Sequence, residues 1–135
     1  MSKKTVLFLC THNAARSQMA EGLLRRLYGD RYDVYSAGVQ PTQVDSDAIA
    51  VMKEIGIDIS RHRSKSIDEF QDAAFDYIVT VCDHAKQTCP FFPGKILIHR
   101  SFNGPTSHQE FQKIRDEMKQ WITDIFAEEE TNTDS

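Results

Sequence analysis

The stretch that decides the fold is Val6-Leu7-Phe8-Leu9-Cys10-Thr11-His12-Asn13-Ala14-Ala15-Arg16-Ser17. It opens with a continuous apolar run of strand length, which is typical of a parallel strand that is covered on both faces. The run ends at a cysteine, and a short loop then leads to an arginine at the start of a helical pattern. This strand, loop and helix predict a site at the carboxyl end of a central strand.

The loop after Cys10 has the length of an anion cradle. Its five residues, Thr11, His12, Asn13, Ala14 and Ala15, can turn their backbone N–H groups around one tetrahedral anion. Asn13 can take a left-handed position in such a turn. Arg16 can grip two anion oxygens with its planar guanidinium, while the N–H groups of the first helical turn face the same point. The sequence therefore predicts an oxyanion-binding loop over residues 11–17.

Cys10 is the candidate nucleophile in this loop. A helix N-terminus and a nearby cation can lower a cysteine pKa from about 8.5 to roughly 3.5–7.5, which gives a thiolate at neutral pH. We expect Ser17 to donate a hydroxyl hydrogen bond to that thiolate. The alternative is that Cys10 is a small buried hydrophobe and Arg16 an ordinary surface charge.

Length and composition favour one small domain. The chain has 135 residues, 40% of them hydrophobic, which fits a single core over residues 1–135. The net charge of -4, without a basic patch, argues against binding to nucleic acid or an anionic membrane. The sequence has no apolar stretch of bilayer-spanning length and no evident signal peptide. We therefore expect a cytoplasmic protein.

Strand and helix patterns alternate along the chain. Strands are predicted over residues 5–9, 32–36, 75–81 and 95–99, and helices over 15–29 and 46–55, with one turn over 67–70 and a long final helix. A polar tail, about residues 129–135, is expected to be disordered. On the first helix, Gln18 and Glu21 are assigned to the outward face. The alternation predicts an α/β fold with a parallel sheet, whose ligands bind at the carboxyl ends of the strands.

Three cysteines indicate reactive thiols or a metal site, because they are too few for a disulfide framework. Cys82 follows a predicted strand as Cys10 does, so the two can meet at one edge of the sheet. Cys82 and Cys89 bracket a polar loop and can form a disulfide, or Cys82 can attack a species held at Cys10. Packing is one alternative, and a zinc site of these cysteines with His84 is another. Their spacing lacks the usual zinc pairs, so we expect no metal.

The stretch from Cys10 to Gly22 resembles the low-molecular-weight tyrosine phosphatase fold, and more closely the thioredoxin-coupled arsenate reductases built on it. Further similarity lies in residues 35–38 and 52–60 and in the pair Cys82 and Cys89. The resemblance implies a three-layer sandwich with a four-stranded parallel sheet, in the order 2-1-3-4, flanked by helices. The cysteine pair discriminates between the two groups, because the phosphatases need only the first cysteine.

This resemblance implies that the protein reduces arsenate to arsenite. Cys10 attacks arsenate while Arg16 and the loop amides stabilise the developing charge. Cys82 then attacks Cys10 and releases arsenite, and Cys89 attacks in turn, which leaves Cys82 and Cys89 joined. No cofactor is bound, thioredoxin supplies the electrons, phosphate and sulfate compete for the loop, and the protein is expected to be a monomer. Two alternatives stay open: a low-molecular-weight protein tyrosine phosphatase, and a non-catalytic module that binds oxyanions or senses oxidation.

One departure from the family pattern concerns the proton donor. Relatives carry an Asp-Pro pair after the fourth strand, and its aspartate protonates the leaving group. Here Gly104 precedes Pro105, and glycine has no proton to donate. Water, His99, His108 or Glu110 would have to serve instead, and we expect the loss to impair phosphatase activity more than arsenate reduction.

A second departure concerns a potassium site that some relatives have. Asn13, Glu21 and Ser36 match its ligands, whereas Lys65 stands where an aspartate would complete the site. An ammonium group there can replace the charge of the ion. We therefore predict a protein that does not depend on potassium.

Overall fold

The computed structural model describes residues 3–70, 73–81 and 94–133. The order of its elements is β1 (Lys4–Cys10), α1 (Arg16–Tyr28), β2 (Tyr32–Gly38), α2 (Ser46–Lys53), η1 (Ile67–Phe70), β3 (Phe75–Thr80), β4 (Gly94–His99) and α4 (His108–Thr133). Each strand and helix predicted from the sequence is present with closely similar bounds. The α/β fold is therefore confirmed.

The four strands form one parallel sheet in the order β2-β1-β3-β4, which confirms the predicted order. β1 lies between β2 and β3, and its residues from Val6 to Leu9 are fully buried. Cys10 at the end of β1 pairs with Gly38 at the end of β2. The central strand thus delivers Cys10 to the carboxyl edge of the sheet, where ligands bind in open α/β sheets.

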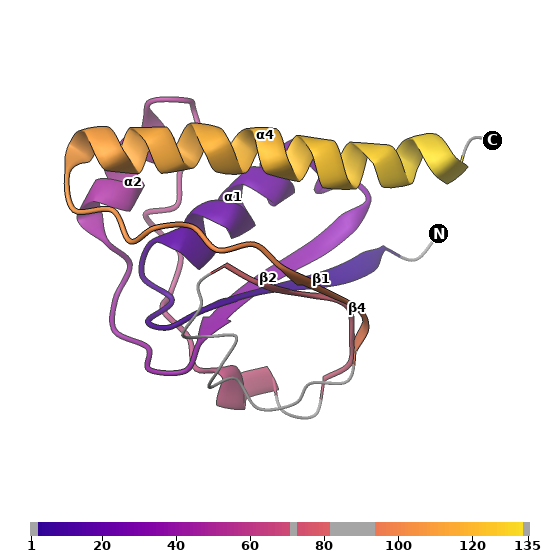
Figure 1. Cartoon of the computed structure of the whole chain (residues 1–135). Coiled ribbons are helices and arrows are strands. Elements are labelled where there is room, and N and C mark those ends of the chain that lie inside the picture. The colour runs from indigo at the N-terminus through magenta and orange to yellow at the C-terminus, as the bar shows by residue number, and fades with distance from the viewer. Residues whose placement is uncertain (1–2, 71–72, 82–93, 134–135) are drawn as a thin grey trace.

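Helices cover the sheet on both sides (Figure 1). α1 packs on β1 and β2, and α4 lies across α1 and α2. η1 lies on the opposite side of the sheet, where the Phe70 ring meets Tyr35 and Phe75 with ring centroids 5.8 Å apart. This is the predicted three-layer arrangement.

The final helix packs through an apolar stripe. Phe111, Ile114, Met118 and Ile122 are buried, and Trp121 packs edge-on against Phe102. The helix reaches Thr133 and so includes residues 129–133, for which we expected a disordered tail; alanine and glutamate at 127–130 favour helix. In the part of the chain that the structure describes, no helix is long and apolar enough to cross a membrane.

A polar cluster joins α2 to α4. Arg115, a charged residue that is buried, donates to Val51 O and to the Glu54 carboxylate, each over 2.8 Å. The same carboxylate accepts from Gln112 and contacts His108, both over 2.9 Å. Hydrogen bonds from Gln112, His108 and Arg115 lower the pKa of Glu54 to about 2. The cluster holds the N-terminal half of α4 on α2.

The cluster around Glu54 predicts a lower free energy of unfolding in acid. The pKa of Glu54 falls from its ordinary 4.5 to about 2 on folding. The contribution of Glu54 to the free energy of unfolding is therefore complete above pH 4.5 and is lost as the pH falls toward 2. Glu54 is solvent-exposed, so screening keeps the effect modest. Denaturant unfolding should show Glu54→Gln less stable than wild type at neutral pH, with the difference shrinking in acid. Glu117→Gln on α4 is the control, and a difference that does not change with pH would contradict the prediction.

Candidate active site

Cys10 lies at the tip of the central strand and is 3% exposed. The Ser17 hydroxyl, also buried, donates to Cys10 Sγ over 3.2 Å. This is the hydrogen bond expected from the sequence, and a hydroxyl donor in this position stabilises negative charge on sulfur.

The loop of residues 11–15 turns its carbonyl groups toward the surrounding protein. The donors are Gln40 N to Thr11 O, Thr42 N and Ser64 Oγ to His12 O, Gln18 Nε2 to Asn13 O, Asp45 N to Ala14 O and Met19 N to Ala15 O. A planar trans peptide points the next N–H in the opposite direction. Within the described part of the chain, the N–H groups of residues 12–15 donate to no protein acceptor. They are thus available to an anion beside Cys10.

Two residues allow the loop its close turn. Asn13 has a φ of 51°, the left-handed conformation that its short polar side chain tolerates. Gly38 lies opposite Cys10, and a Cβ there would come within 2.7 Å of both Asn13 N and Thr11 O. Only glycine lets β2 pass this close to the loop. The predicted strand ended before Gly38, so its role emerges only from the structure.

Arg16 is the first residue of α1. Its Nη1 donates to Phe102 O over 2.9 Å, which ties the loop to the segment that follows β4. A Cβ at Gly104 would lie 4.0 Å from Arg16 Cζ and Nη2. The residue that replaces the expected acid therefore stands beside the guanidinium, where a Cβ would be in ordinary van der Waals contact with it.

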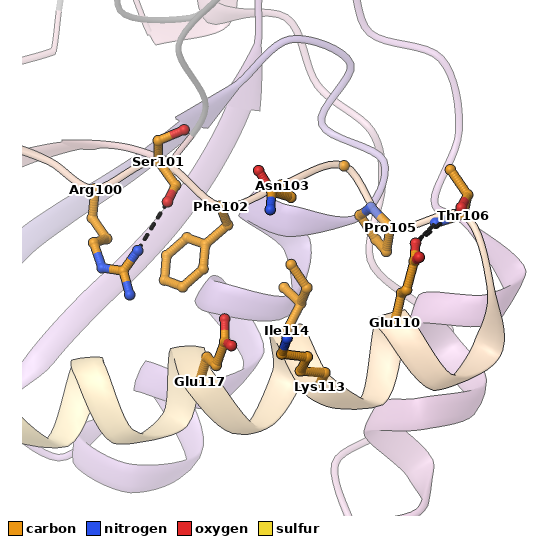
Figure 2. A pocket seen from close by; sticks show the side chains of 11 residues that line it. Arg100, Ser101, Phe102, Asn103, Pro105, Thr106, Glu110, Lys113, Ile114 and Glu117 are labelled. Carbon is orange, nitrogen blue, oxygen red and sulfur yellow. Dashed lines mark hydrogen bonds between the residues drawn. The ribbon is translucent and has the colours of Figure 1, made fainter.

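The three candidate substitute acids are engaged elsewhere. Glu110 borders a pocket of about 450 Å³ between residues 100–106 and α4 (Figure 2), and it accepts from Thr106 N over 2.7 Å and Thr106 Oγ1 over 2.9 Å. These hydrogen bonds lower the pKa of Glu110, which keeps it ionised and unsuited to give a proton. His108 is bonded to Glu54, and His99 Nδ1 lies 2.7 Å from Thr80 Oγ1.

The residues that match potassium ligands are already bound to one another. The Ser36 hydroxyl donates to Glu21 Oε1, and Arg25 donates to Glu21 Oε2 over 2.6 Å. Lys65 Nζ lies 3.8 Å from Glu21 Oε1, and Asn13 Oδ1 accepts from Gln18 Nε2 and Lys65 N. Burial lowers the pKa of Lys65, which Glu21 partly opposes. The Lys65 ammonium lies beside Glu21, and the side-chain oxygens of Asn13, Glu21 and Ser36 are all engaged in hydrogen bonds. These residues therefore do not fit a potassium ion.

The structure corrects one assignment on the first helix. Gln18 and Glu21, which we placed on its outward face, are buried. Gln18 Nε2 donates to Arg63 O, so a polar loop covers this side of α1. A helix face that packs on polar backbone carries no apolar signal, so it resembles a solvent face in the sequence.

The second and third cysteines, with His84, lie outside the described residues. Among the residues that the structure does describe, no group of three or more side chains is arranged to hold a metal ion. The structure brings together Cys10, Arg16, Ser17 and the loop between them. It also brings the predicted auxiliary residues Glu21, Ser36 and Lys65 into contact with one another.

Comparison with known proteins assigns the chain to a family. The family model for low molecular weight phosphotyrosine protein phosphatases matches residues 5–134. The chain belongs to this family. It is 45% identical to arsenate reductase 1 of Staphylococcus epidermidis over 122 residues, which is 88% of this chain and 92% of that protein.

Solved structures in this family also include arsenate reductases. One is an arsenate reductase in the phosphate binding state, with a TM-score of 0.81 and 30% identity, over 93% of this chain and 98% of that one. Another is a thioredoxin-dependent arsenate reductase of Corynebacterium glutamicum, with a TM-score of 0.80 and 30% identity, over 96% of this chain and 63% of that one.

The loop geometry predicts that phosphate protects Cys10. In a chain with Cys82→Ser and Cys89→Ser, phosphate should slow the alkylation of Cys10 by iodoacetamide. Arg16→Lys should raise the phosphate concentration needed by about tenfold, because an ammonium cannot make the two parallel hydrogen bonds of a guanidinium. Arg26→Lys, on the exposed side of α1, is the matched control. Equal protection in both variants would mean that Arg16 does not bind the anion.

Proposed function

We propose that this protein is an arsenate reductase in which Cys10 is the nucleophile. The observation that carries the proposal is the loop itself: its carbonyl groups of residues 11–15 are held outward, so that free N–H groups, Arg16 and a Ser17-bonded thiol converge. The 45% identity to an arsenate reductase of Staphylococcus epidermidis supports arsenate as the oxyanion. A neighbour whose structure is described as an arsenate reductase in the phosphate binding state supports tetrahedral anions as ligands of this loop.

In the first step, the Cys10 thiolate attacks arsenic, a sulfur–arsenic bond forms, and an arsenate oxygen leaves as hydroxide or water. The loop N–H groups and Arg16 stabilise the charge on the remaining oxygens. Since His99, His108 and Glu110 are engaged elsewhere, solvent supplies the proton.

In the second step, Cys82 attacks Cys10 Sγ, so that arsenic takes the electron pair of the sulfur–arsenic bond and leaves as arsenite. Cys89 then attacks Cys82, which frees the Cys10 thiolate and leaves a Cys82–Cys89 disulfide for thioredoxin to reduce. The described chain supports a meeting at this edge, because Val81 N donates to Leu9 O, next to Cys10. Thioredoxin as the reductant is supported by the similarity to a thioredoxin-dependent enzyme of Corynebacterium glutamicum.

A phosphotyrosine phosphatase is the second candidate, since the family name describes that activity. An arsenate oxygen is more readily replaced than the leaving group of a phosphate ester, so ester hydrolysis depends more on a general acid. Gly104 has none, and among the described residues the side-chain atoms within 4.0 Å of a Cβ built there belong to the Arg16 guanidinium. The geometry therefore favours reduction over ester hydrolysis.

The proposed relay of thiols, from Cys10 to Cys82 to Cys89, predicts distinct phenotypes for three serine variants. Arsenate-dependent NADPH consumption, coupled through thioredoxin and thioredoxin reductase, should fall to background in Cys10→Ser, Cys82→Ser and Cys89→Ser. Cys89→Ser should still release arsenite in a single turnover and accumulate a Cys10–Cys82 disulfide, which mass spectrometry detects. Cys82→Ser should stop before arsenite release.

Aryl-phosphate hydrolysis by the same variants provides the control. Any such activity should depend on Cys10 alone and should be slow compared with arsenate reduction. Rapid hydrolysis without arsenate turnover would establish a phosphatase instead. Oxyanion binding with neither activity would indicate a binding or redox-sensing module.

Lys65 predicts independence from potassium. Its contact with Glu21 supplies the positive charge that the ion would bring, so turnover should be equal in sodium and potassium buffers of equal ionic strength. Lys65→Asp removes that charge and adds an oxygen ligand, and its turnover should rise with potassium. Clear stimulation of the wild-type protein by potassium would contradict the prediction.

A further inference from the structure

The segment that follows β4 carries a phenylalanine that contacts α4 with its ring and α1 with its carbonyl group. Phe102 is 3% exposed, and Figure 2 shows its ring pointing toward α4. The ring meets that of Trp121 edge-on, with the two centroids 5.5 Å apart. On its other side, Phe102 O accepts from Arg16 Nη1 over 2.9 Å. Phe102 therefore connects the final helix to the arginine of the proposed anion site.

Two further contacts hold Phe102 in place. Phe102 N donates to Val81 O over 3.1 Å, which ties the backbone of this segment to the end of β3. The Arg100 guanidinium lies over the Phe102 ring, with its Cζ 4.5 Å from the ring centroid, and such a contact between a cation and an aromatic face is attractive. Because the backbone and the ring are both held, the carbonyl group of Phe102 has a defined direction.

The Phe102 carbonyl group selects the edge of the Arg16 guanidinium that meets the anion. A guanidinium has five N–H groups in one plane and can bind an oxyanion through two parallel hydrogen bonds. With Nη1 of Arg16 on Phe102 O, the edge formed by Nε and Nη2 is left for the anion. Within the described part of the chain, neither of these two nitrogens donates to a protein acceptor. A long side chain that is already aligned also loses less conformational entropy on binding.

We propose that Phe102 is a positioning residue, whose carbonyl group aligns Arg16 for the oxyanion and whose ring is anchored on α4 by Trp121. The ring packs on α4, so it acts on the anion only through the carbonyl group and the guanidinium. A small misplacement of a group that binds the reacting species can cost much of its effect. The inference rests on the proposed function only in taking Cys10 and Arg16 as the anion site.

The test removes the anchor on α4 and changes no residue of the loop. In the full chain carrying Cys82→Ser and Cys89→Ser, Trp121→Ala is compared with Trp121→Phe, which keeps an aromatic ring at this position. The readout is the phosphate concentration that halves the rate of Cys10 alkylation by iodoacetamide. Trp121→Ala should raise this concentration about three- to tenfold, and Trp121→Phe by less than about twofold, because misalignment weakens the paired hydrogen bonds of the guanidinium.

A double-mutant cycle separates alignment from a general loss of stability. In a chain with Arg16→Lys, Trp121→Ala should change the phosphate concentration by less than about twofold, because an ammonium has no planar edge to align. Ile125→Ala removes apolar packing one turn further along α4, and this control should leave the protection by phosphate unchanged. If Trp121→Ala does not fold, Trp121→Leu provides the variant without a ring.

Several outcomes would overturn the proposal. Protection that is unchanged in Trp121→Ala, or weakened equally in the alanine and phenylalanine variants, would mean that the ring contact does not align the guanidinium. Additive effects of Trp121→Ala and Arg16→Lys would mean that the anchor acts by another route. Tighter phosphate binding in Trp121→Ala would mean that Phe102 O competes with the anion. Because alkylation needs neither arsenate nor thioredoxin, failure of arsenate reduction with the expected pattern intact would count against the proposed function alone.

Discussion

The carbonyl groups of residues 11–15 all accept hydrogen bonds from the surrounding protein, and the rest of the site depends on this arrangement. A planar peptide cannot turn its C=O one way without turning the next N–H the other way. The donors come from the segments after β2 and α2 and from α1, three places far apart in sequence. The fold therefore preorganises the proposed anion-binding loop, and preorganisation reduces the entropic cost of binding.

The charged side chains near the loop are paired with one another. Glu21 is buried next to the loop, yet it meets Ser36, Arg25 and Lys65. A buried carboxylate without partners would be costly and would oppose a second negative charge at Cys10. The cation at Lys65 is covalently part of the chain, so this arrangement does not depend on an ion from solution.

The residue at position 104 bears on the choice between two proposed reactions of the same loop, arsenate reduction and phosphate-ester hydrolysis. The loop, the thiol and Arg16 serve any tetrahedral anion, and the acid beside them decides which leaving groups depart easily. A glycine next to Arg16 retains binding while it removes the proton donor. The proposed relay tolerates this loss, because its later steps exchange electrons between sulfur atoms and need no carboxylic acid.

Local patterns in the sequence determined the strands, the helices, the loop of residues 11–17 and the candidate nucleophile, because an apolar strand, a cysteine and an arginine at a helix start are neighbours in the chain. The sheet order and the discriminating cysteine pair came from resemblance to a family. Only the tertiary structure decided which residues support the loop. Gly38, Gln18 and Phe102 act across contacts between segments distant in sequence, and polar packing between such segments leaves no periodic apolar signal.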